Sequence, residues 1–210
     1  FLTSHIQPKD MKELIISPNS SFEWLIKKIE NEIDFAKKNL PSGIWIKCNA
    51  IVDSKLIEKL YEASNAGVKI NLFVRGICCL KPNVKGLSEN IIVKSIIGRF
   101  LEHGRIYVFA NGGEFQSIKN DVYISSADMM PRNLYTRVEA YVPLKNETVR
   151  SQILTQVIPA LINDTKNSWL LEQTGEYVKL EDKLNFCSHS YFMENPSLSG
   201  QGTLSKFKTA

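Results

Sequence analysis

Residues 44–74 read IWIKCNAIVDSKLIEKLYEASNAGVKINLFV, and this stretch decides the fold class. Its first nine residues are mostly apolar and include several β-branched side chains, which predicts a buried strand. Asp53 is a good N-cap for a helix over 54–66, which Gly67 ends. Residues 68–74 form a second apolar run. A strand, a helix and a strand in succession predict two parallel strands joined by a crossover helix.

The flanking sequence extends this unit into one mixed α/β domain, a mixed sheet flanked by helices. Amphipathic helices are predicted over 18–39 and 147–161. The long connection 76–90 is expected to be a loop, and a loop of this length in a compact domain is more often functional than idle. Four further strands are predicted at 91–97, 105–110, 122–125 and 137–144.

Composition divides the chain into three parts. Residues 1–17 are expected to be a linker, 18–183 the folded domain, and 184–210 a polar, disordered tail. The sequence does not begin with Met, as expected of a piece cut from a longer protein. Two of the three histidines, His5 and His189, lie in the end segments and are interpreted as solvated residues.

Bulk properties indicate a folded domain with a weak preference for anions. The chain has 210 residues, of which 43% are hydrophobic and 10% aromatic, enough for one core. A net charge of +4 fits an anionic ligand but does not distinguish nucleic acid, nucleotide, membrane surface or no partner. No apolar run approaches the roughly 18 residues of a membrane span. The cysteines show no zinc spacing and are expected to be reduced, mostly buried cytoplasmic thiols: Cys48, Cys78, Cys79 and Cys187.

The remaining histidine, His103, precedes a predicted strand and lies two residues before Arg105. This spacing can place imidazole and guanidinium on the same side of a strand. The pair suits phosphate chemistry, because arginine holds phosphoryl oxygens through a planar fork and histidine exchanges protons near neutral pH. The alternative is a surface histidine beside a structural salt bridge.

A second polar group follows the strand at 122–125, where Ser126, Asp128 and Arg132 succeed one another. Together with His103 it resembles the phospholipase D superfamily pattern, His-x-Lys followed downstream by Gly-Ser-x-Asn. Several positions depart from that pattern, which argues against an ordinary phosphodiesterase. Arg105 stands at the lysine position, Ser125 at the glycine, Asp128 at the final position and Ala110 where an acid is expected.

Arg75 and Gly76 directly follow the second strand of the opening unit. The carboxyl end of a parallel strand is where α/β sheets place ligands. Arg75 is therefore a candidate phosphate-binding residue, and the alternative is a loop arginine paired with a carboxylate.

Five segments, in order and spacing, resemble the C-terminal domain of polyphosphate kinases over roughly residues 10 to 180. They are KCNAIVD (47–53), VRGICCL (74–80), GLSENI (86–91), GRFLEH (98–103) and SADMMPRNL (126–134). The resemblance implies a phospholipase D-like fold and reversible transfer of the γ-phosphate of ATP onto polyphosphate with Mg²⁺.

The resemblance also implies roles for single residues. The family's second essential histidine falls on His103 and its ATP-contacting arginine on Arg75. The phosphorylated histidine and the magnesium ligands are expected upstream of this chain, so the fragment alone is expected to be inactive and to hold no metal. Asp128 is expected to orient His103 by accepting its second N–H. Met129 replaces a tryptophan common in the family, a change expected to alter packing at the rim of the site.

The implied partners are ATP or ADP, polyphosphate, the other domains of the parent enzyme and further copies of it, without nucleic acid. The implied location is cytoplasmic, with peripheral membrane association of the parent left open. Two alternatives stay open from the sequence: a phospholipase D-superfamily phosphodiesterase or nuclease, and a non-catalytic module that binds polyphosphate or nucleotide.

Overall fold

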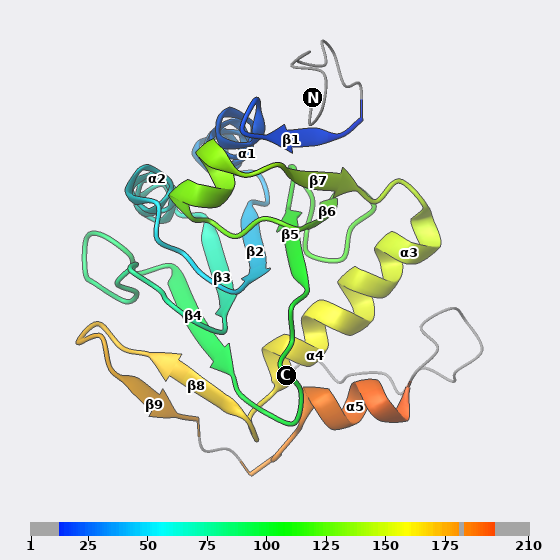
Figure 1. Cartoon of the computed structure of the whole chain (residues 1–210). Helices are drawn as coiled ribbons and strands as arrows, with labels where there is room; N and C mark the ends of the chain where they lie inside the picture. The colour runs from blue at the N-terminus through cyan, green and yellow to red at the C-terminus, as the bar shows by residue number, and fades with distance from the viewer. Residues whose placement is uncertain (1–12, 181–182, 196–210) are drawn as a thin grey trace.

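The computed structural model describes residues 13–180 and 183–195, and these form one mixed sheet flanked by helices (Figure 1). Within the described residues the sheet has nine strands in the order β1-β7-β6-β5-β2-β3-β4-β8-β9. The strands are β1 (Ile15–Ser17), β2 (Gly43–Cys48), β3 (Lys69–Val74), β4 (Ile91–Ile96), β5 (Arg105–Phe109), β6 (Asp121–Ser125), β7 (Glu139–Pro143), β8 (Ser168–Leu171) and β9 (Tyr177–Lys179). The helices are α1 (Ser21–Lys37), α2 (Ser54–Asn65), α3 (Glu147–Gln152), α4 (Ile158–Asn163) and α5 (Ser188–Glu194), with π-helical turns η1 (Arg132–Thr136) and η2 (Ile153–Val157).

The predicted strand, helix and strand unit is confirmed as β2, α2 and β3. The two strands are parallel, and β4 adds a third parallel strand beside β3. The Asp53 carboxylate accepts the Leu56 N–H at 3.0 Å, so it caps α2 as expected. Gly67, with φ of +95°, follows the helix in a conformation that favours glycine.

Helices cover both faces of the sheet (Figure 1), and each face has its own apolar core. Helices α1 and α2 cover one face, where Leu25, Leu60 and Ile46 belong to one buried apolar cluster. The segment running through α3, η2 and α4 covers the other, where Leu154 and Ile158 pack in a cluster with strand side chains. The predicted helix over 147–161 is therefore one helical segment interrupted by a π-helical turn. Burial on both faces explains why the central strands are apolar almost throughout.

The sheet topology gathers several chain segments at one edge. The parallel strands β2, β3 and β4 all end there. Strand β5 is antiparallel to β2, so it begins at the same edge with Arg105, which pairs in register with Ser125 at the end of β6. The loops that follow β2, β3 and β6 and the loop before β5 therefore meet in space.

The ends of the described chain are more ordered than their composition suggests. Ile15–Ser17, expected in a linker, forms β1 and pairs with β7. The expected polar tail contains helix α5, and its His189, expected to be solvated, is only 2% exposed. Long-range contacts order this helix, because the Asp164 carboxylate accepts hydrogen bonds from the Ser188 N–H and hydroxyl at 2.7 Å each. Residues 196–210 and His5 lie outside the described residues.

Two further expectations concern thiols and membranes. All four cysteines are unpaired, but only Cys48 is fully buried, so the expectation that most are buried is wrong. Burial raises the pKa of the half-buried Cys78 thiol to about 11. No helix in the described part of the chain has the length and apolarity needed to cross a membrane.

Candidate functional site

The loops at the common edge line a cavity of about 400 Å³. Every candidate site residue from the sequence lies on it: Arg75, His103, Arg105, Ser126, Asp128 and Arg132. The sheet therefore brings together side chains from the loops after β3 and β6, the start of β5 and the turn η1. A cavity of this size is in the range of small-molecule sites, which span roughly 300–1,000 Å³.

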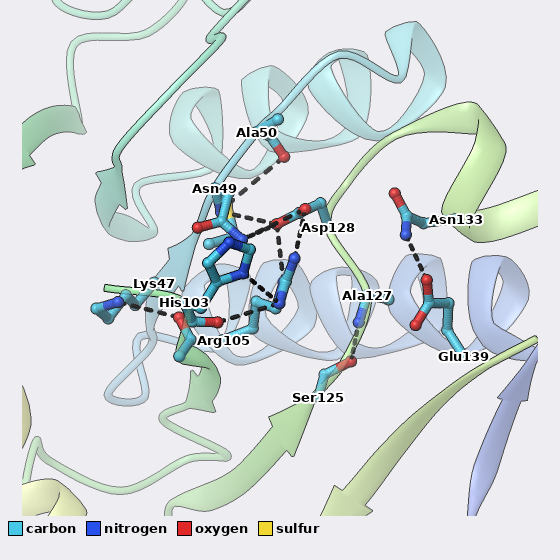
Figure 2. A network of polar contacts seen from close by, with 12 residues as sticks. Lys47, Asn49, Ala50, His103, Arg105, Ser125, Ala127, Asp128, Asn133 and Glu139 are labelled. Atoms are coloured by element: carbon cyan, nitrogen blue, oxygen red, sulfur yellow. Dashed lines mark hydrogen bonds and ion pairs between the residues drawn. The ribbon is translucent and has the colours of Figure 1, made fainter. Parts of the chain in front are cut away.

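Asp128 is the centre of the polar network in the cavity wall (Figure 2). Its carboxylate receives two hydrogen bonds from Arg105, from Nε at 3.1 Å and from Nη2 at 2.9 Å. It also accepts the Asn49 backbone N–H at 2.7 Å. Burial opposes ionisation of Asp128, but the hydrogen bonds from Arg105 and Asn49 outweigh it and hold the pKa of the carboxyl below its usual value. Asp128 is therefore charged at neutral pH and paired with Arg105.

His103 contacts Arg105, not Asp128. Arg105 Nη1 lies 3.3 Å from His103 Nδ1 and donates to the His103 carbonyl oxygen at 3.1 Å (Figure 2). The expectation that Asp128 orients His103 directly is wrong, because both carboxylate oxygens are taken by Arg105 and Asn49. His103 and Arg105 therefore lie side by side, as their spacing predicted, and Arg105 links the imidazole to the carboxylate. The alternative of a surface histidine beside a structural salt bridge describes the same geometry, because His103 is exposed and Arg105 pairs with Asp128.

The guanidinium of Arg75 has an unused donor. Its Nη1 is buried and has no hydrogen-bond partner within the described residues. No carboxylate forms an ion pair with Arg75 in the same part of the chain, so the structure does not support the alternative of a structural loop arginine. A buried, unpartnered charged donor is costly unless a ligand completes it.

Gly76 lets the loops after β2 and β3 come into contact. Its N–H donates to the Asn49 carbonyl oxygen at 2.9 Å. A Cβ at this position would lie 2.8 Å from the same oxygen, closer than real Cβ contacts allow. Glycine is therefore needed to bring Arg75 beside Asn49.

Sequence reasoning missed several residues of the site. Lys47 Nζ contacts Glu102 and the Gly104 carbonyl oxygen, both at 3.0 Å, and so holds the residues on either side of His103. Arg137 lines the same cavity, and Asn133 donates to Glu139 at 2.6 Å in its wall. The available signal for Lys47 was a lysine within an otherwise apolar strand.

Ser126 and Arg132 lie at the open side of the cavity and are exposed. The Ser126 hydroxyl accepts the Ala140 N–H at 3.2 Å, which joins the loop after β6 to β7. Met129, expected at the rim, is instead completely buried and forms an isolated bridge with Ile51. The methionine therefore packs beneath the site.

The charges of the cavity favour an anionic ligand. Four arginines line it against two carboxylates, Asp128 and Glu139, which leaves an excess of two positive charges. Arginine forks suit phosphate groups, since they donate two parallel hydrogen bonds. Across residues 13–180 and 183–195, no cluster of His, Cys, Asp and Glu side chains could hold a metal ion.

Comparison with known proteins places this geometry in a family. The sequence profile described as "Polyphosphate kinase C-terminal domain 2" matches residues 14–188. The chain is 50% identical over 203 residues to a polyphosphate kinase of Erythrobacter litoralis, covering 96% of this chain and 28% of that protein. It is 44% identical to the polyphosphate kinase of Synechocystis over 85% of this chain and 24% of that protein.

Solved structures agree with the sequence comparisons. The crystal structure of polyphosphate kinase from Porphyromonas gingivalis matches with a TM-score of 0.86 and 31% identity, over 93% of this chain and 29% of that one. A phospholipase D family member, Nuc from Salmonella typhimurium, shows a weaker likeness, with a TM-score of 0.49 and 12% identity. The chain spans 24–29% of the length of these polyphosphate kinases. It belongs to the polyphosphate kinase C-terminal domain family.

Proposed function

We propose that this chain is the C-terminal catalytic domain of a polyphosphate kinase and supplies half of its active site. In this proposal the γ-phosphate of ATP passes reversibly to a histidine outside this chain and from there to polyphosphate. The supporting observation is the buried, unpartnered Nη1 of Arg75, on a residue that lines an arginine-rich cavity together with His103. Arg75 forms no ion pair within the described residues, so its positive charge is available to a phosphate group in this cavity.

Arg75 is proposed to hold the phosphates of ATP. Phosphoryl transfer depends mainly on positioning and on neutralising charge, which a fixed guanidinium provides. Arg132 and Arg137 at the open side would guide the anionic chain toward Arg75. Arg105 has a different task, because Asp128 already neutralises it.

His103 is proposed to assist as a hydrogen-bond donor. A guanidinium N–H can only donate, so the neighbouring Nδ1 of His103 accepts, and the neutral imidazole carries its proton on Nε2. An Nε2–H can stabilise a phosphoryl oxygen or protonate a leaving oxygen. A nucleophilic histidine needs a ring nitrogen with a free lone pair, whereas in this tautomer the Nδ1 lone pair accepts from Arg105 and Nε2 carries the proton. Arg105 offers no acceptor, which supports the assisting role.

The remaining parts of the reaction are proposed to lie outside this chain. These are the phosphorylated histidine and the ligands of Mg²⁺, which would neutralise phosphate charge when bound. ATP or ADP and polyphosphate are the proposed substrates. The other domains of the parent, and further copies of it, are the proposed protein partners, in the cytoplasm.

The test uses the parent enzyme and labelled ATP. His103→Ala should abolish polyphosphate synthesis, while the phosphohistidine trapped from the wild type should map by mass spectrometry outside residues 1–210. His103→Gln is the matched variant: its amide places an N–H near the position of Nε2 but is no nucleophile, so it should retain more activity than alanine. Phosphate found on His103 itself would refute the assisting role and favour a phosphodiesterase-like nucleophile.

A further inference from the structure

Helix α5 lies beside the loop that carries His103. The helix packs beside α4, and the Asp164 carboxylate at the end of α4 accepts hydrogen bonds from Ser188 at the start of α5. The next residue, His189, is 2% exposed. The helix has only seven residues, so an almost completely buried histidine on it needs a structural or functional reason.

His189 binds the backbone of that loop. Its Nδ1 accepts the Phe100 N–H at 3.2 Å, three residues before His103, and its ring lies 5.5 Å from the Phe100 ring. The approach is close at Gly98 as well, where a Cβ would lie 2.6 Å from His189 Nδ1. The adjacent Ile97 N–H donates to the Asn167 carbonyl oxygen at 2.9 Å. Helix α5 and the residue before β8 thus fix the first half of the loop.

Lys47 fixes the second half. Its contacts with Glu102 and Gly104 enclose His103 from both sides. A small cavity of about 20 Å³ joins these supports, with Lys47, Glu102, His189 and Arg75 all in its wall. Since an orienting residue must be locked by its own neighbours, His103 depends on two supports: Lys47 on β2 and His189 on α5.

We propose that His189 is a positioning residue for the reaction, which acts through the Phe100 N–H to hold the His103 loop in its working geometry. The inference rests on the proposed function of His103. It assigns a task to a C-terminal helix that otherwise contributes nothing to the phosphate cavity. His189 touches no phosphate in this scheme, and the imidazole serves as a hydrogen-bond acceptor.

The experiment compares two substitutions of similar size in the parent enzyme. His189→Leu fills the space but removes the acceptor, whereas His189→Asn places an oxygen near the position of Nδ1. The leucine variant should lower kcat about 10- to 100-fold with the KM for ATP unchanged, as expected when a catalytic group is displaced by about 1 Å. The asparagine variant should recover most of the loss. Met193→Ala, at a 40% exposed position of the same helix, is the control and should have wild-type kcat.

Hydrogen–deuterium exchange of peptides covering residues 97–104 provides a readout independent of catalysis. Exchange should be faster in His189→Leu and return toward the wild-type rate in His189→Asn. If the leucine variant does not fold, Gly98→Ala perturbs the same contact from the loop side and should give the same kinetic pattern. Wild-type kcat in the leucine variant, or equal losses in both His189 variants, would overturn the inference. A wild-type parent without polyphosphate synthesis would refute the proposed function, and the exchange rates would still decide whether His189 fixes the loop.

Discussion

The pair between Arg105 and Asp128 should contribute measurably to stability, and Asp128→Asn is the substitution that tests it. The two side chains are only 16% and 7% exposed and share two parallel hydrogen bonds. The asparagine keeps the shape but removes the charge and turns an NH₂ group toward the donors of Arg105 and Asn49. Breaking one partner of a buried pair costs about 3–5 kcal/mol. Arg105 retains some contact with solvent, so we expect a loss near the lower limit, about 3 kcal/mol.

The assay is urea and thermal unfolding of the purified chain. For a domain of this size, a loss of about 3 kcal/mol lowers Tm by roughly 6–12 °C. The matched control is Glu13→Gln, which removes a carboxylate from the pair with Lys145, in which both side chains are 64% exposed. An exposed pair contributes roughly 0–1 kcal/mol, so the control should unfold within a few degrees of the wild type. Equal effects of the two substitutions would refute the assigned importance of the Arg105–Asp128 pair.

The same prediction has a pH dependence with a definite sign. The folded-state pKa of Asp128 lies below its ordinary value of 3.8. The stabilisation from this group is therefore fully present above the pKa of the unfolded chain and is lost as the pH falls through the folded pKa. The difference in unfolding free energy between wild type and Asp128→Asn should be constant from pH 7 to about 5 and shrink below about 4. A difference that grows on acidification would contradict the reasoning.

Three other predictions address the site. In the parent enzyme, Arg75→Ala should lower kcat/KM for ATP about 10²–10³-fold, which corresponds to roughly 2.7–4 kcal/mol, and Arg75→Lys should restore only part of the loss. Wild-type turnover of the alanine variant in steady-state assays would show that Arg75 does not contribute to the reaction. The purified 210-residue chain should make no polyphosphate when it is incubated with ATP and Mg²⁺, because a reaction that lacks its nucleophile loses most of its rate. Polyphosphate detected on a gel would disprove this prediction. Gly76→Ala should destabilise the chain by about 1–3 kcal/mol in denaturant unfolding, because the added Cβ would lie 2.8 Å from the Asn49 carbonyl oxygen. An unchanged denaturation midpoint would show that the loops after β2 and β3 can move apart without cost.

The sequence by itself determined the central sheet and which residues would line the candidate site. Apolar runs, the Asp53 cap and Gly67 are local signals, and they correctly predicted β2, α2 and β3 and the parallel pairing of the strands. Arg75 and His103 were found for the same reason, since each lies next to the end of a predictable strand. The sequence does not show to which face of a strand a charged side chain points or which residue it binds. The contacts of Lys47, which lies in an apolar strand, were therefore not predicted.

Only the tertiary structure decided the partners within the site. The sequence led us to expect Asp128 to bind His103. In the structure Asp128 instead binds Arg105, 23 positions earlier in the chain, and Asn49, 79 positions earlier. His189 contacts Phe100 across 89 positions, although its surroundings in sequence resemble a disordered tail. Local propensity carries no information about such pairs, because the residues of each pair become neighbours only in the folded sheet. Their free energy comes from burying hydrogen-bonded and charged groups together, and that depends on the packed fold.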